Sequence, residues 1–278
     1  MKITFAPRIA LVVAATIFLH LNATAVEVDL GTANNFAVLA GSAVTSTGNT
    51  VVNGGNVGLD PNTLSSITGF PPGIVNTPYI IEAANGVTLQ AQADLTTAYN
   101  VAAGPLTHVN LSGQDLGLVG PLTPGVYFFS SSAQLTGTLT LDDQGNPDAV
   151  FVFQIGSTLT TASNSKVVTI NDGPNPTPGI SVFWQVGSSA TLGTGTDFEG
   201  NILAYASITD DGGSTVQGRL LAETAAVTLN DTTITVPPAE EVGGGGGGNV
   251  PDSASTLPLL GFGVATLFAF RRRFISLA

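Results

Sequence analysis

Short alternations of apolar and polar residues fill the chain between residues 26 and 237, with Gly, Thr, Val, Ala and Asn dominating. This pattern is typical of short strands joined by turns, because side chains alternate between the two faces of a strand. An apolar residue is repeatedly followed by Thr, as in Leu159-Thr160 and Ile208-Thr209. The sequence therefore predicts a mainly β domain whose strands have one buried and one exposed side.

Internal repeats indicate how these strands are arranged. Residues 198–204 (FEGNILA) resemble residues 216–222 (VQGRLLA), at an offset of 18 residues. Residues 153–157 (FQIGS) match residues 184–188 (WQVGS) at an offset of 31, and the Pro-rich segment 172–179 supplies the excess. A period of about 18 to 20 residues is expected for one coil of a three-sided β-helix, with three short strands and three corners.

The repeat register predicts columns of side chains that stack from coil to coil. The inward column is apolar and comprises Val44, Leu135, Leu159, Ala190, Ile208 and Val227. The next residue of each coil points outward, which gives Thr45, Thr136, Thr160, Thr191, Thr209 and Thr228. A second outward column lies two residues earlier and comprises Ala43, Gln134, Thr158, Ser189, Ser207 and Ala226. Coils stack at roughly 4.7–4.9 Å, so the two columns form a flat grid of small side chains.

Two interpretations of this grid remain open. Thr is favoured in strands, so the columns can be an ordinary exposed strand surface. The aligned strands carry no Lys, Arg or Glu, which favours a surface kept uncharged for binding. The sequence does not decide which of the two adjoining columns is the working one.

One segment has helical periodicity instead. Ala91, Leu95, Ala98 and Ala102 recur at helical spacing. We predict one helix from about Thr88, as the N-cap, to Ala103, before Gly104 and Pro105, packed along one side of the β-helix. Since it separates the coil of Thr45 from the later coils, we expect a discontinuous β-helix built from non-contiguous coils.

The N-terminal residues 1–25 have the features of a signal peptide. Lys2 and Arg8 provide positive charge, residues 9–19 are apolar, and Ala23-Thr24-Ala25 fits a cleavage site before Val26. An apolar run of 11 residues is too short to span a bilayer, which argues against a membrane anchor. The domain of residues 26–237 is therefore expected to be exported.

The C-terminal residues form a Gly-rich linker (238–250) and a terminal segment (251–278). Residues 250–254 read VPDSA, residues 257–270 are apolar, and Arg271 to Arg273 follow. This arrangement resembles a PEP-CTERM-type sorting signal, which implies an exosortase as processing enzyme, although Ala254 stands where the Val-Pro-Asp-Ser-Gly variant has Gly. The alternative is an ordinary tail anchor, in which the apolar segment holds the chain in the membrane. Both interpretations place the domain at the cell surface or in the extracellular matrix.

Composition excludes several functions. Only 9% of residues are charged, the net charge is −12 and Cys is absent, so we expect no nucleic acid partner, no disulfide and no thiolate metal site. Between the two ends the basic residues are Lys166 and Arg219, and the one His is His108. We predict no catalytic residue, no metal, no cofactor and a monomer.

A β-helix lyase or hydrolase is the enzymatic alternative, and it needs carboxylates arranged as a site. The pairs Asp142/Asp143 and Asp210/Asp211 lie in Gly-rich corners, where we interpret them as solvated turn residues, and no carboxylate column accompanies Lys166 or Arg219. Residues 142–148 (DDQGNPD) superficially suggest a calcium loop but lack the spacing of an EF-hand loop and its closing Glu. We therefore expect no enzyme.

Four motifs resemble a known family. They are residues 35–42 (NFAVLAGS), 94–100 (DLTTAYN), 122–127 (LTPGVY) and 183–190 (FWQVGSSA). Together they resemble the ice-binding proteins of bacteria, fungi and diatoms, over residues 29–236. The resemblance implies a right-handed, discontinuous β-helix with one long helix alongside, and ice or ordered water as the partner.

The family motif Thr-Ala/Gly-x-Thr/Asn is matched by residues 47–50 (TGNT) and 161–164 (TASN), and in part by residues 194–197 (TGTD). Residues 209–212 (TDDG) and 229–232 (LNDT) depart from it, and the hydrated charges of Asp210, Asp211 and Asp231 would limit the ice-binding patch. The expected ice-binding residues are Thr45, Thr47, Thr50, Thr136, Thr158, Thr160, Thr161, Asn164, Ser189, Thr191, Thr194, Thr196, Ser207, Thr209 and Thr228. The hypothesis is an exported antifreeze protein that inhibits ice recrystallisation. The alternative is an adhesin or matrix protein on the same scaffold, without ice activity.

Overall fold

The computed structural model describes residues 28–104, 108–172 and 181–238. The expected signal peptide, the Gly-rich linker from residue 239 on and the sorting segment lie outside the described residues. All described residues belong to one compact unit. Among them, no helix is long and apolar enough to cross a membrane.

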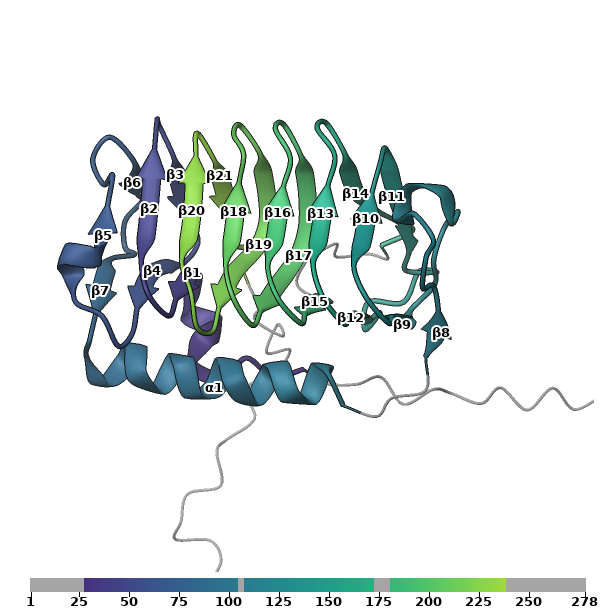
Figure 1. Cartoon of the computed structure of the whole chain (residues 1–278), viewed down its shortest axis with the longest axis horizontal. Coiled ribbons are helices and arrows are strands. Elements are labelled where there is room, and N and C mark those ends of the chain that lie inside the picture. The colour runs from purple at the N-terminus through teal and green to yellow at the C-terminus, as the bar shows by residue number, and fades with distance from the viewer. Residues whose placement is uncertain (1–27, 105–107, 173–180, 239–278) are drawn as a thin grey trace, which may run out of the picture. The chain divides into compact units, whose positions relative to one another are not determined.

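The chain forms a three-sided, right-handed β-helix in which all strand pairs are parallel (Figure 1). One side is a seven-stranded sheet, which we call the threonine face. Its strands, in spatial order, are β10 (Ala133–Leu135), β13 (Leu159–Thr161), β16 (Ala190–Leu192), β18 (Ile208–Asp210), β20 (Val227–Asn230), β2 (Val44–Thr47) and β5 (Ile67–Thr68). Figure 1 shows them side by side, toward the viewer.

The other two sides belong to a 14-stranded sheet. The helix face, which is covered by the long helix, contains β8 (Val109–Asn110), β9 (Gly125–Phe129), β12 (Phe151–Ile155), β15 (Val182–Val186), β1 (Phe36–Ala40), β4 (Asn56–Leu59) and β7 (Ile81–Ala83). The open face contains β11 (Thr138–Asp142), β14 (Lys166–Ile170), β21 (Thr233–Thr235), β3 (Val51–Asn53) and β6 (Ile74–Val75). Strands β17 (Asp197–Ala204) and β19 (Thr215–Ala222) run through both faces.

Glycine makes the corner inside these two long strands. Gly200 and Gly218 are register partners and have φ of 123° and 143°, a region that L side chains rarely adopt. A Cβ on Gly218 would lie 2.2 Å from the carbonyl oxygen of Gly200, so the coils can stack at this corner only without a side chain. The repeat of residues 198–204 and 216–222 is thus a repeat of one corner, and the predicted register is confirmed.

The stack is discontinuous, as predicted. The last coil in the sequence lies beside the first, because β20 pairs with β2 through Val227 and Val44. Strand β1 likewise lies between β19 and β4. The 31-residue offset is also confirmed, since Phe153 is the register partner of Trp184.

Helix α1 (Gly86–Ala102) lies along the helix face (Figure 1). It begins earlier than predicted, because Asn85 is the N-cap and accepts hydrogen bonds from the backbone N–H groups of Val87 and Thr88. Thr88 is the reciprocal partner, since its hydroxyl accepts from the backbone N–H of Asn85. The four residues at helical spacing are buried as predicted: Ala91, Leu95, Ala98 and Ala102.

Two apolar cores hold the domain together. The first fills the β-helix and contains a ladder of aromatic rings, with centroids of Phe153 and Trp184 3.9 Å apart. The second lies between α1 and the helix face, where Leu95 belongs to the same cluster as Phe36 and Leu203. The predicted inward column is fully buried. The remaining described elements are the 3-10 helices η1 (Gly31–Asn35), η2 (Leu64–Ser66) and η3 (Leu116–Leu118).

Candidate functional site

The threonine face presents a central column of outward side chains, one from each strand. In spatial order they are Gln134, Thr160, Thr191, Thr209, Thr228, Thr45 and Thr68. Six consecutive strands therefore place Thr at the same register position. The residue before each of these Thr is apolar and packs in or against the core of the β-helix, so one inward neighbour of every Thr fixes the backbone beneath the column.

The register of β10 differs from the prediction. Ala133 and Gln134, not Leu135 and Thr136, are the partners of Leu159 and Thr160. Thr136 lies two residues further along and donates a hydrogen bond from its hydroxyl to Asp115 Oδ2 at 2.6 Å. The prediction was wrong because Ala-Gln-Leu-Thr offers two apolar-polar pairs that periodicity alone cannot distinguish.

Thr68 was missed at the opposite end of the column. It follows Ile67, and this pair aligns with Val44 and Thr45. The apolar-Thr signal was therefore present in the sequence. It escaped notice because the coil around it has a long Pro-rich connection and matches the repeat poorly.

A hydroxyl-rich column lies beside the central one. It comprises Ser132, Thr158, Ser189, Ser207, Ala226 and Ala43, with Ser132 in the place predicted for Gln134. Neighbouring members are hydrogen-bonded: Thr158 Oγ1 donates to Ser132 Oγ at 2.8 Å, and Ser207 Oγ donates to Ser189 Oγ at 2.9 Å. These bonds restrict the hydroxyl rotamers, so four of the six residues in this column present oriented oxygen atoms.

On the other side of the central column the surface is less uniform. Thr47 Oγ1 donates to Asn230 Oδ1 at 3.1 Å across β2 and β20. Asp211, which follows β18, is exposed there and brings a negative charge to the edge of the face. Asn164 and Thr194 are exposed at the next corner, where the backbone N–H of Asn164 donates to the carbonyl of Thr194.

Three predicted ice-binding residues are buried and cannot touch ice. Thr50, Thr161 and Thr196 are between 0% and 2% exposed. Thr161 and Thr196 are hydrogen-bonded to each other at 2.8 Å, and Thr161 also accepts from the backbone N–H of Gly193. These hydroxyls satisfy the backbone at the corner between the threonine face and the open face. The family motif thus mixes surface and interior positions in this chain.

Asp210 is also buried rather than solvated. It accepts hydrogen bonds from Ser214 Oγ and Thr232 Oγ1, both at 2.5 Å. It occupies the inward position that Leu192 has in the adjacent, preceding coil. Its charge therefore does not face the surface, which corrects the prediction. Asp231 remains exposed at the corner, where it accepts from the backbone N–H of Asn49.

The central column and the hydroxyl-rich column carry no charged side chain between Gln134 and Thr68. Beyond Gln134 the central column continues to Asp115, which pairs with it in an isolated bridge. Burial of Asp115 opposes its ionisation, but hydrogen bonds from Thr136 and Gly117 outweigh this effect and lower its pKa. Asp115 is therefore ionised and bounds the uncharged surface at that end.

Charged side chains gather on the open face instead. Lys166 forms an ion pair with Asp197, its register partner, so this lysine does have a carboxylate beside it. The hydroxyl of Thr215 also donates to Asp197. Both hydrogen bonds lower the pKa of Asp197, with that from Lys166 the stronger.

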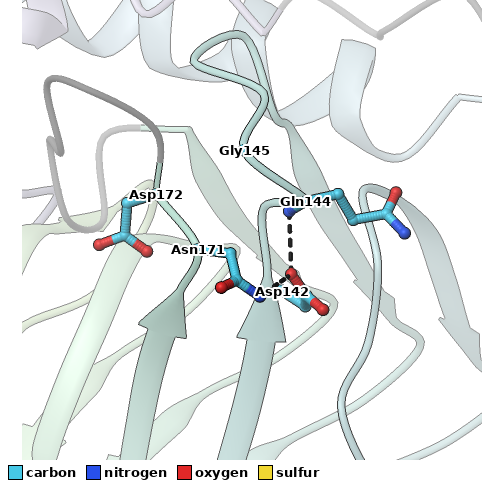
Figure 2. Close-up of a pocket in the computed structure, with 5 residues that line it drawn as sticks. All are labelled: Asp142, Gln144, Gly145, Asn171 and Asp172. Atoms are coloured by element: carbon cyan, nitrogen blue, oxygen red, sulfur yellow. Dashed lines mark hydrogen bonds between the residues drawn. The ribbon is translucent and has the colours of Figure 1, made fainter.

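The acidic turn after β11 does not assemble a metal site. Figure 2 shows Asp142 accepting hydrogen bonds from Asn171 and from the backbone N–H of Gln144, with Asp172 set apart. Both bonds end on the same oxygen of Asp142, at 2.8 and 2.9 Å. Within the described ranges, no three His, Cys, Asp or Glu side chains are grouped so that they could hold a metal ion. Asp142 therefore stabilises the turn through these hydrogen bonds.

Comparison with known proteins assigns this scaffold to a family. The family model described as "Ice-binding-like" matches residues 38–235, and a "VPDSG-CTERM motif" matches residues 249–274. The sorting motif indicates export and a cell-surface location. Both resemblances predicted from the sequence are confirmed.

Curated relatives and solved structures agree with this assignment. An ice-binding protein of Nostoc sp. (strain HG1) is 54% identical over 248 residues, covering 88% of this chain and 87% of the relative. The crystal structure of an ice-binding protein from an Antarctic biological consortium has a TM-score of 0.69 at 44% identity, covering 75% of this chain and 90% of its own. That from the ascomycete Antarctomyces psychrotrophicus also has a TM-score of 0.69, at 39% identity, covering 76% of this chain and 98% of its own. The chain belongs to the ice-binding-like family.

Proposed function

We propose that this protein binds ice through the threonine face and slows the growth and recrystallisation of ice. The observation that carries the proposal is the run of six Thr in register, from Thr160 on β13 to Thr68 on β5. An exposed strand surface of ordinary composition would include Lys, Arg or Glu, and these two columns contain none. Relatives that carry the name ice-binding protein support the choice of ligand.

Binding of ice would depend on the spacing of the Thr side chains and needs no reactive group. Each Thr hydroxyl can anchor one water, while each methyl group confines the water beside it. Coil spacing of roughly 4.7–4.9 Å repeats this pattern along the stack. The hydroxyl column beside it, with Ser207 bonded to Ser189, adds a second row of fixed oxygens. No proton transfer and no cofactor take part.

The surface has defined limits. Asp115 and Gln134 bound the Thr run at one end of the stack, and Asp211 brings a charge to its edge. A carboxylate holds its own hydration shell, which opposes an ice-like arrangement of water. We therefore expect moderate rather than strong ice activity.

Two bulky substitutions test the face. Thr160→Tyr and Thr191→Tyr each place a ring in the central column, which should remove most of the thermal hysteresis and leave the fold intact. Thr235→Tyr on β21 is the matched control, because Thr235 is a partly exposed strand residue of the open face. Hysteresis and circular dichroism of residues 26–237, which contain both cores, provide the two readouts.

Unchanged thermal hysteresis in both Thr160→Tyr and Thr191→Tyr would exclude the threonine face as the ice-binding surface. If the wild-type domain fails to shape ice crystals even at high protein concentration, the alternative of an adhesin or matrix protein without ice activity replaces the proposal.

We also propose that the chain is exported through the signal peptide of residues 1–25 and processed by an exosortase at the C-terminal motif. The matched sorting motif supports this route. If processing does not occur, residues 257–270 would anchor the protein in the membrane. Mass spectrometry of the mature protein should find Val26 at the N-terminus and cleavage near residue 250. An intact C-terminus on the mature protein would contradict processing.

The domain is proposed to be monomeric, and sedimentation should give the mass of one chain.

A further inference from the structure

A buried arginine lies at the corner opposite the threonine face. Arg219 on β19 is 4% exposed, and its Nε and Nη2 donate to the carbonyl of Asn34 at 3.2 and 3.1 Å. Its Nη1 donates to Asn201 Oδ1 at 2.9 Å. These acceptors are neutral, and among the described residues the structure shows no ion pair to Arg219. A buried charge without an opposite charge is costly, so an anion that reached this guanidinium would be stabilised by it.

A cavity of about 340 Å³ opens beside Arg219. Its lining combines polar groups of Asn34, Asn35, Asn56 and Tyr79 with apolar groups of Val236 and Pro237. Asn56 is held in place, since Nδ2 donates to Glu82 at 3.0 Å and Oδ1 accepts from Ile80 N at 3.1 Å. This size and this mixture of amide, aromatic and apolar groups suit one sugar ring better than a bare ion.

The charge state and geometry of Arg219 define the ligand further. Burial lowers the pKa of Arg219 to about 10, which still leaves the guanidinium charged at neutral pH. The three hydrogen bonds use three of the five N–H groups that a guanidinium has, and the planar fork favours carboxylates.

We propose that this corner binds a carboxylated sugar, such as a uronate residue of a surface polysaccharide. The carboxylate would neutralise Arg219, while sugar hydroxyls would bond to the amides of Asn34 and Asn35. The corner joins the open face to the helix face, so a polysaccharide and ice can be bound at the same time. The proposal does not depend on ice binding.

Galacturonate, galactose and acetate are the probes for this site. Each is titrated into the ¹⁵N-labelled domain of residues 26–238, which includes every residue that lines the cavity, while chemical shifts are recorded. Galacturonate is expected to shift the signals of Asn34, Asn35 and the Arg219 side chain, with affinity at least about tenfold above that of galactose or acetate. Equal binding of acetate would reduce the site to a simple anion site and overturn the sugar assignment. Equal binding of galactose, or no shift with any probe, would overturn the proposal.

Three variants locate the effect. Arg219→Gln should weaken galacturonate binding by about tenfold or more. Lys166→Gln removes a charge from the open face and should leave galacturonate binding unchanged. Because Arg219→Gln can disturb the fold, Tyr79→Ala gives a second reading, since it keeps every hydrogen bond of Arg219 and should still weaken binding. Binding that survives in both Arg219→Gln and Tyr79→Ala, or that is lost equally in Lys166→Gln, would overturn the proposal. Thermal hysteresis should stay unchanged in Tyr79→Ala, which separates this site from the ice face.

Discussion

Two adjacent aspartates show how one step along a strand changes the role of a side chain. Asp210 points inward and binds the hydroxyls of Ser214 and Thr232, while Asp211 is exposed at the edge of the threonine face. A sequence motif presents them as an acidic pair. The alternation of side chains across a strand separates them into an interior hydrogen-bond acceptor and a surface charge.

Asp210→Ala should therefore destabilise the domain. The substitution leaves the buried hydroxyl of Thr232 without its acceptor and that of Ser214 with only the carbonyl of Gly193 at 3.4 Å, at a total cost of about 1–3 kcal/mol. Asp211→Ala is the matched control and should change the free energy of unfolding by no more than about 0.5 kcal/mol. Urea denaturation of both variants measures the difference. Equal stabilities would show that Asp210 does not hold this corner.

Asp211 should limit ice activity rather than stability. Asp211→Thr removes the charge from the edge of the central column and is expected to raise thermal hysteresis above the wild-type value. Asp148→Thr, in the exposed turn after β11, removes a charge far from the threonine face and should have no effect. A loss of activity in Asp211→Thr would mean that the carboxylate takes part in binding.

At the scale of elements, helix α1 depends on its first turn. Asn85 caps two backbone N–H groups, at 2.9 Å each, and its amide also donates to Glu82. Asn85→Ala should lower the free energy of unfolding by about 0.5–2 kcal/mol. Asn100→Ala, an exposed change within the helix, is the control. Thermal denaturation monitored at 222 nm measures both, and an equal effect would contradict the capping role.

The terminal coil of the stack is a sheet end made of short edge strands and Pro-rich connections. Strands β5, β6 and β7 each pair on one side only, and the connections around them contain Pro61, Pro71, Pro72 and Pro78. Proline has no N–H to donate, so the connections offer fewer donors for pairing with another chain, and the three edge strands are only two or three residues long. This arrangement is consistent with the proposed monomer.

Elements with strong local signals could be predicted from the sequence. Repeats at 18 and 31 residues located β12, β15, β17 and β19, and apolar spacing located α1. The register of β10 could not be predicted, because packing against the adjacent coil decides which of two neighbouring apolar-polar pairs aligns with β13. The inward side of Asp210 follows from alternation after the outward Thr209, and it was missed because Asp210 was interpreted as a turn residue although β18 extends through it.

The whole molecule should be most stable in mildly acidic solution. Burial raises the pKa of Glu199 and of Glu223 to about 7, and one carboxylate oxygen of each is buried without a hydrogen-bond partner among the described residues. Between the ordinary value of 4.5 and about 7, the folded state holds more protons than the unfolded state, so stability falls as pH rises through that window. The pKa values of Asp94, Asp115 and Asp197 are lowered in the folded state. These three groups therefore stabilise the fold above their ordinary pKa, and this stability is lost as the pH falls below it.

The melting temperature is accordingly expected to be higher at pH 5 than at pH 8. The double variant Glu199→Gln with Glu223→Gln should reduce this dependence, because it removes the two carboxyl groups whose pKa burial raises to about 7. Asp148→Asn, an exposed change, should preserve it. A wild-type protein whose melting temperature rises between pH 5 and pH 8 would contradict the role of these two residues.

Direct observation of the protein on ice tests the central claim, that the threonine face binds ice. A single ice crystal is grown in a solution of the fluorescently labelled domain, and the fluorescence bound to its surface is recorded. The wild-type domain and Thr235→Tyr should both label the crystal. A variant with Thr209→Tyr and Thr228→Tyr, in the middle of the Thr run, should leave it dark. Equal labelling by that variant, or none by the wild-type domain, would contradict the account.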